Sequence, residues 1–133
     1  MQNVILRSFF TNDAFMRKVV PFMQPEYFEG VHRTVFKEFV TYVAQYSNIP
    51  SMEAFRITMQ ESGNFNEDTL RVAVDMLPSL FEKDSDTDIA WLMDQTEKWC
   101  QDRALFNAVM ESISIIDGKH QTLTKNALPD ILS

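Results

Sequence analysis

The sequence predicts an all-α fold, a compact helical globule of five or six helices followed by one long helix. Three observations lead to this prediction. Only three glycines and five prolines occur among the 133 residues, so strong turn signals are rare. Apolar residues recur at steps of three and four, which is the helical period. An apolar content of 45% and eleven phenylalanines are enough for one packed core.

The beginning of the globule is predicted from apolar clusters and from the residues that start and stop helices. A short first helix covers residues 4–10, where two apolar clusters are at helical spacing. Thr11 or Asn12 can cap a second helix over 13–20, and Pro21 ends it. We expect the inward-facing residues of this second helix to be Ala14, Phe15 and Val19.

The centre of the core is predicted to be a helix over residues 31–46. Before it, Pro25 fits the first turn of a short helix that carries Tyr27 and Phe28. The main apolar stripe of the helix follows steps of four and three, and three further apolar residues widen it. The stripe consists of Val31, Val35, Phe39, Tyr42 and Tyr46, and the wider set adds Phe36, Val40 and Val43.

Two more helices follow, each with a recognisable cap. Ser51 can cap a helix that runs to about Gln60, with Gly63 as its terminator. Asn66 can cap the next helix, whose first turn carries acidic residues that suit the helix dipole. Pro78 predicts a kink or a break in that second helix.

The last predicted element is a long helix over residues 88–117, preceded by the polar linker 84–88. At 1.5 Å per residue such a helix is about 45 Å long. Its C-terminal half is apolar over a wider arc than its N-terminal half, and a small globule has little to cover the far end. We therefore expect burial against another chain. A polar loop is expected from Gly118, and another helix is expected to begin at 128–132.

The charge of the chain is acidic and uneven. The net charge is −7, and residues 53–102 alone carry four basic and twelve acidic groups, a balance of −8. Such a surface repels nucleic acid, because binding to phosphates requires lysine and arginine. Two interpretations stay open: a solvated face that keeps the protein soluble, or a face that steers a basic protein partner.

The sequence contains none of the common motifs for catalysis or metal binding. There is no G-x-x-x-x-G-K-[ST] phosphate loop, no G-x-S-x-G and no H-E-x-x-H. His32 and His120 have no companion ligands, so His32 is interpreted as a packed or capping residue. The single Cys100 suits a reducing compartment. The sequence also has no signal peptide and no apolar run that could span a membrane, so a soluble cytoplasmic protein is expected.

Short motifs are spread over most of the chain. They are Pro21-Phe22-Met23, Pro25-Glu26-Tyr27-Phe28-Glu29, His32-Arg33-x-x-Phe36-Lys37, Ile49-Pro50-Ser51, Trp91-Leu92, Thr96-Glu97, Gln101-x-Arg103-Ala104-x-Phe106-Asn107-Ala108 and Pro129-Asp130-Ile131. In this order they resemble the N-terminal domain of DnaB-type replicative helicases, in particular those of T-even-type bacteriophages. The predicted loop 118–127 is a departure, because it is shorter than in that family.

The resemblance implies a globular subdomain over 1–86 and a helical hairpin over 87–133, whose second arm is truncated, as in an N-terminal fragment of a longer helicase. In that family paired hairpins form a dimer, and three dimers form the collar of a hexamer that contacts primase and in some cases a loader. ATP and Mg²⁺ belong to the missing motor domain, so this chain has no cofactor and is no enzyme by itself. Strong direct DNA binding and membrane binding are not expected, and the compartment is the cytoplasm of an infected bacterium.

Candidate contact residues follow from these patterns. The expected subunit interface is Trp99, Arg103, Phe106, Val109, Met110, Ile113 and Ile116. For Trp99, Phe106, Met110 and Ile113, the alternative is a place in the core of the monomer. Arg103 interrupts an apolar stripe, so it either extends to solvent or, as we favour, pairs with a carboxylate across the interface. The acidic face expected to steer a partner is Glu67, Asp68 and Asp75. The alternative function is a free-standing acidic helical adaptor or inhibitor that binds a basic DNA-handling protein.

Overall fold

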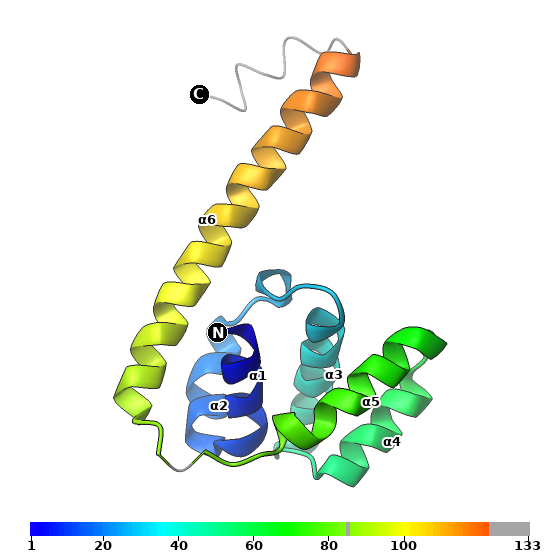
Figure 1. Ribbon diagram of the computed structural model, residues 1–133, viewed down its shortest axis with the longest axis vertical. Coiled ribbons are helices and arrows are strands. Elements are labelled where there is room, and N and C mark those ends of the chain that lie inside the picture. Colours follow the sequence, from blue (N-terminus) through cyan, green and yellow to red (C-terminus); the bar gives the residue numbers. More distant parts are fainter. Residues whose placement is uncertain (85, 123–133) are drawn as a thin grey trace.

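The computed structural model describes residues 1–84 and 86–122, with side chains through Gly118. These residues form six α-helices and two short 3-10 helices and contain no strand, which confirms the all-α prediction. Five α-helices make the globule, and the sixth runs along one side of it and extends beyond it (Figure 1). The elements are α1 Gln2–Thr11, α2 Asp13–Val19, η1 Val20–Phe22, η2 Pro25–Tyr27, α3 Val31–Tyr46, α4 Met52–Ser62, α5 Glu67–Leu80 and α6 Ile89–Thr122.

The predicted helix starts are confirmed by their capping contacts. The side chain of Asn12 accepts a hydrogen bond from the backbone N–H of Phe15, and Ser51 accepts one from Ala54. Asn66 accepts from Thr69, whose hydroxyl in turn accepts from the Asn66 backbone, so the two residues form a capping box. Asp88 accepts from Ala90 at the start of α6. Each cap satisfies a backbone donor that the helix itself leaves open.

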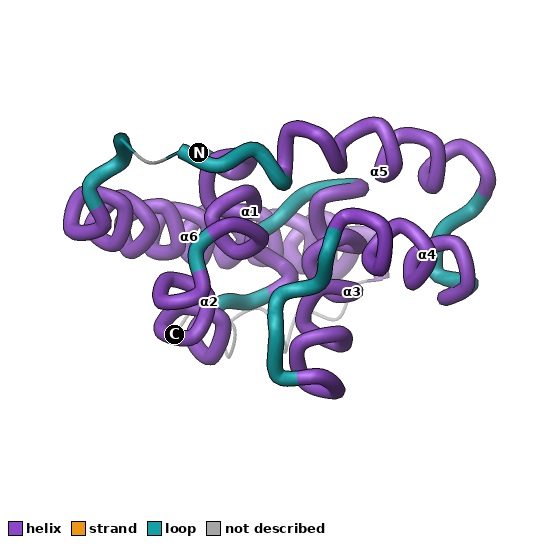
Figure 2. Tube along the Cα trace, turned by 90° about the horizontal axis from the view of Figure 1, so that it is seen from below, coloured by secondary structure: helices purple, strands orange, loops and turns teal. Residues whose placement is uncertain are grey.

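The core is a cluster of phenylalanine rings around α3. Phe9 of α1 contacts Phe15, Phe36 and Phe39 at ring-centroid distances of 5.2, 5.4 and 6.0 Å. Phe10, also of α1, lies 4.5 Å from Phe39 between ring centroids. These distances are typical of stabilising aromatic pairs. Figure 2 shows α3, α4 and α5 grouped together on one side, with α2 and α6 on the other.

Three details of the helical prediction are wrong. Ala14 is exposed, and Met16 is buried in its place; Tyr46 is also exposed, because α3 extends past the core. Pro78 does not break α5, which continues to Leu80. Because Pro78 lies in the last turn, its missing N–H removes only one hydrogen bond near the helix end.

The predicted polar loop at Gly118 is also wrong at its start, since α6 continues as a helix to Thr122. A glycine inside a helix costs only about 1 kcal/mol relative to alanine, which the preceding turns can absorb. The rest of the predicted loop and the second arm at 128–132 lie outside the described residues. The division of the chain near residue 86 stays a prediction.

Candidate functional site

The two halves of α6 have different surroundings. In the proximal half, residues 89–103, Leu92 and Thr96 are buried against the globule. Trp99 packs onto η2 and the residue after it, with its ring 5.0 Å from Phe28 and 6.4 Å from Tyr27. The described part of the distal half, residues 104–118, forms only one hydrogen bond to the globule, from Asn107.

The segment around η2 holds α6 through its backbone. Nε of Arg103 donates to the carbonyl oxygen of Tyr27 at 2.9 Å, and Nδ2 of Asn107 donates to that of Glu26 at 2.9 Å. Arg103 also forms an ion pair with Glu29 at 2.8 Å. The carboxylate that Arg103 pairs with in the described structure belongs to the same chain. A pairing across a subunit interface stays a prediction. The acceptors in η2, one for Arg103 and one for Asn107, carry no sequence signal, because both are backbone oxygens.

An apolar surface, which we name the distal stripe, covers one side of the distal half. Its six side chains are between 37% and 66% exposed. At 3.6 residues per turn they span about 140° of the helix circumference and about 16 Å of its length. The distal stripe consists of Leu105, Phe106, Val109, Met110, Ile113 and Ile116.

The seven predicted interface residues divide between the two halves of α6. Trp99 and Arg103 are partly buried on the globule of their own chain. Phe106, which lies under the guanidinium of Arg103 at 4.7 Å from ring centroid to Cζ, begins the distal stripe. The other four, Val109, Met110, Ile113 and Ile116, are exposed. The structure thus presents five of the seven as one continuous surface.

The three predicted steering carboxylates are all exposed on α5. Glu67 and Asp68 are in its first turn, while Asp75 lines a groove of about 570 Å³ that also contains His32. Asp68 and Asp75 are seven residues apart and therefore share a helix face. Asp68 is 3.6 Å from Arg71, an exposed pair that contributes little to stability. The carboxylates therefore remain available to a partner.

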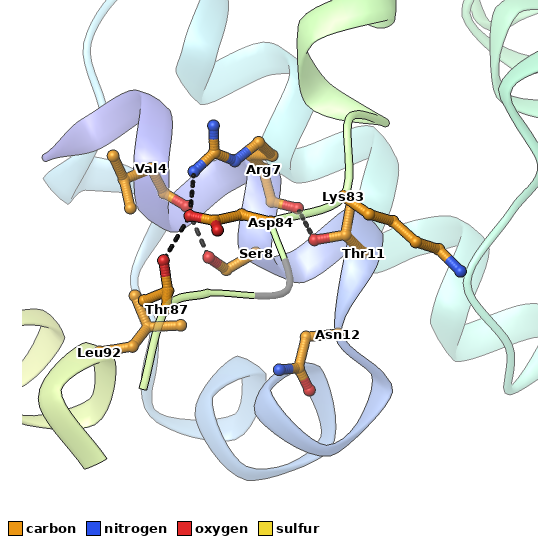
Figure 3. Close-up of a pocket in the computed structure, with 9 residues that line it drawn as sticks. All are labelled: Val4, Arg7, Ser8, Thr11, Asn12, Lys83, Asp84, Thr87 and Leu92. Carbon is orange, nitrogen blue, oxygen red and sulfur yellow. Dashed lines mark hydrogen bonds and ion pairs between the residues drawn. The ribbon is translucent and has the colours of Figure 1, made fainter. Parts of the chain in front are cut away.

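The base of α6 is fixed by a small polar cluster. Arg7 of α1 reaches Asp84 at 3.5 Å, and the hydroxyl of Thr87 also donates to Asp84 (Figure 3). The hydrogen bond from Thr87, together with one from the backbone N–H of Asp86, lowers the pKa of the Asp84 carboxyl. This cluster lines a pocket of about 180 Å³ between α1 and the linker. The start of α6 is thereby tied to the first helix of the globule.

Other kinds of site have no support in residues 1–84 and 86–122. No group of three or more His, Cys, Asp or Glu side chains there could hold a metal ion. His32 instead pairs with the side chain of Asn3, and burial lowers its pKa. None of the described helices is long and apolar enough to cross a membrane.

Comparison with known proteins supports the resemblance found in the motifs. The chain is 34% identical over 116 residues to a DnaB-like replicative helicase of Enterobacteria phage T4. The match covers 86% of this chain but only 24% of the helicase, so the chain corresponds to one region of a much longer protein. No protein-family model matches the chain.

Proposed function

We propose that this chain is the oligomerisation and partner-docking domain, the collar, of a hexameric replicative DNA helicase in a phage-infected bacterial cytoplasm. The distal stripe is the observation that carries the proposal, because a long helix that exposes six large apolar side chains needs a partner surface. The similarity to the T4 helicase region supports the same function. ATP and Mg²⁺ would act in the motor domain of the full protein, since the sequence contains no phosphate loop.

Self-association through the distal stripe should be weak in the isolated domain. Each of its six side chains is already partly buried, so pairing would contribute about 1 kcal/mol per side chain. Association itself costs at least about 4 kcal/mol in lost translational and rotational freedom. The two contributions are of similar size, so little net binding free energy remains for two isolated copies. Additional contacts in the hexamer would then be needed for a stable collar.

Sedimentation equilibrium tests this function. We expect Phe106→Glu with Ile113→Glu to lower the average mass at high concentration while circular dichroism still reports a folded helical protein. The matched control is Ala104→Glu with Ala108→Glu, which places two charges on exposed positions of the opposite side of the same turns. An unfolded stripe variant, or an unchanged average mass, would contradict the proposal.

The second part of the proposal is docking of primase, and of a helicase loader, to the collar. We expect Glu67, Asp68 and Asp75 to attract a basic surface on primase, since they are exposed within the segment whose balance is −8. Such steering raises the association rate more than the final affinity.

The same acidic segment also favours a second candidate function, a free-standing adaptor or inhibitor of a basic DNA-handling protein. An adaptor of this kind would bind its target as a monomer. A binding assay with the Phe106→Glu, Ile113→Glu variant separates the two functions. An adaptor would keep full binding to its partner, whereas a collar would lose its multivalent attachment.

A further inference from the structure

A groove of about 410 Å³ lies between the second halves of α3 and α4, and we name it the α3–α4 groove. Its lining combines carboxylates, hydroxyls and amides with two tyrosine rings. No lysine, arginine or histidine among the described residues lines it. The four side chains that matter most are Glu38, Tyr42 and Tyr46 of α3 and Glu61 of α4.

Glu38 is a buried carboxylate without a cation, since only 5% of its surface is exposed. Its Oε1 accepts a hydrogen bond from Nδ2 of Asn64, but within residues 1–84 and 86–122 its Oε2 accepts none and Glu38 forms no ion pair. No side-chain oxygen in this part of the chain is both fully buried and unpartnered, so Oε2 reaches the groove that Glu38 lines. A buried carboxylate is costly unless a cation or enough hydrogen bonds compensate it.

The other charges around the α3–α4 groove have the same sign. Glu61 is exposed on the α4 side. The last residues of the two helices, Tyr46 of α3 and Ser62 of α4, also line the groove, and neither helix has a basic residue in its last turn. Because a helix C-terminus carries a partial negative charge, two carboxylates and two helix ends together make the groove complementary to a cation.

The two tyrosines add an aromatic wall to this negative groove. Tyr42 and Tyr46 are one turn apart on α3, and their ring centroids are separated by 4.7 Å. Tyr46 is 54% exposed, and Tyr42 is partly exposed. A cation is attracted to the face of an aromatic ring. The planar guanidinium of arginine can stack on such a ring and donate to a carboxylate at the same time, which favours arginine over lysine.

We propose that the α3–α4 groove binds an arginine side chain that projects from a basic segment of another protein. The guanidinium would donate to Oε2 of Glu38 and to Glu61 while it stacks on a tyrosine. Arginine is among the residue types that dominate binding hot spots. The inference goes beyond the proposed function, because this site uses neither the distal stripe nor the three steering carboxylates of α5.

Peptide binding to the whole chain, followed by NMR, tests the proposal. The probe is a blocked pentapeptide with one arginine between glycines. Its matched controls carry lysine, or citrulline, which has the shape of arginine without the charge. At about 0.15 M salt, where the Debye length is about 8 Å, we expect the arginine peptide to shift the amide signals of residues 38–46 and 58–64. The lysine peptide should bind roughly threefold more weakly and the citrulline peptide about tenfold more weakly. Equal binding of arginine and either control, or shifts centred elsewhere, would overturn the proposal.

Glu38→Gln provides a second measurement, because it can keep the acceptor for Asn64 while it removes the charge. We expect it to weaken binding of the arginine peptide roughly tenfold, while the thermal unfolding midpoint stays equal or rises. A lower midpoint with unchanged peptide binding would mean that Glu38 has only a structural role, and the proposal would be overturned. Tyr42→Leu with Tyr46→Leu should weaken binding roughly threefold, because the aromatic wall is lost.

The control for general acidity removes three charges from α5, through Glu67→Gln with Asp68→Asn and Asp75→Asn. This variant should bind the arginine peptide as tightly as the unchanged chain. A loss as large as that of Glu38→Gln would show that the overall negative charge attracts the peptide, and the proposal would be overturned. Sedimentation of the Phe106→Glu, Ile113→Glu variant does not depend on the α3–α4 groove, so the failure of either proposal is seen separately.

Discussion

The proximal and distal halves of α6 share one helix and one apolar rhythm, but they differ in what covers their apolar side chains. Leu92 and Trp99 in the proximal half pack against the globule. Leu105 and Ile113 in the distal half face solvent in the described structure. The spacing of apolar residues identifies an apolar side of a helix, but it does not identify the surface that covers it.

The change between the two halves is visible along a single line of the helix. Followed backwards at steps of three and four, the line of the distal stripe passes through Asp102, Lys98, Gln95 and Trp91. This line is polar in the proximal half apart from Trp91, and it becomes apolar from Leu105 onward. The proximal half therefore needs only one covered face, whereas the distal half offers a second one for a partner.

The largest expected effect is the difference in stability loss between removing a buried aromatic ring and removing an exposed one. Phe28 is fully buried, with Phe36 at 4.9 Å and Trp99 at 5.0 Å between ring centroids. Phe28→Ala should lower the free energy of unfolding by about 3–5 kcal/mol, because it leaves a cavity where α6 meets the globule. The comparison variant is Phe106→Ala in the distal stripe, which should cost about 1 kcal/mol or less. Urea unfolding at low protein concentration measures both, and equal losses would remove the distinction between the halves.

The next effect tests how Arg103, at the border of the two halves, attaches α6 to the globule. Arg103→Met keeps the apolar stem but removes the hydrogen bond to the Tyr27 carbonyl and the ion pair with Glu29. We expect a loss of roughly 1–2 kcal/mol, mostly from the bond to Tyr27, because Glu29 is largely exposed. Lys98→Met, at an exposed position five residues earlier on α6, serves as the control and should change stability little. If Arg103 mattered only across a subunit interface, stability at low concentration would not change.

A smaller effect concerns the acidic globule rather than α6. Reversing the charges of Glu67, Asp68 and Asp75 together should slow association with the primase that we propose as a partner, by up to about tenfold at low salt. Raising the salt concentration should reduce the difference, because the Debye length falls from about 10 Å at 0.1 M to about 3 Å at 1 M. Stopped-flow kinetics measure the rate. An association rate independent of salt would leave the acidic excess with a role in solubility alone.

The sequence predicts local features well because they depend on neighbouring residues. Asn12, Ser51 and Asn66 are caps in the structure as predicted, and Gly63 ends α4 in the left-handed conformation. Of the kink or break expected at Pro78, the break is wrong, because the effect of a proline depends on its distance from the helix end. Local patterns thus locate helices better than they locate helix ends.

Contacts between distant parts of the chain could not be predicted in the same way. The sequence does not predict the partners of Arg103 within the chain, because they lie more than seventy residues earlier and include a backbone oxygen. Phe22 gave no signal of its exposure, because an apolar residue near a helix end usually packs inward. Such contacts depend on the tertiary fold, which brings η1 and η2 against α6.

The smallest effect is confined to the globule and involves pH. His32 of α3 pairs with Asn3 of α1 in the groove that Arg7 and Asp75 also line. Burial lowers its pKa below the ordinary value of 6.5, so the folded protein favours the neutral ring. The unfolded chain then binds more protons as the pH falls through and below 6.5, and stability should decrease there, while at higher pH this contribution is constant.

Replacing this ring identifies its share of the pH dependence. In His32→Gln, thermal unfolding should depend less on pH between 6.5 and the range near 4 in which carboxylates titrate. Self-association through the distal stripe should not change over the same interval, because its six side chains are all apolar. A loss of self-association that follows the His32 titration would mean that the globule and the distal half of α6 are coupled, and the two regions could then no longer be treated as independent.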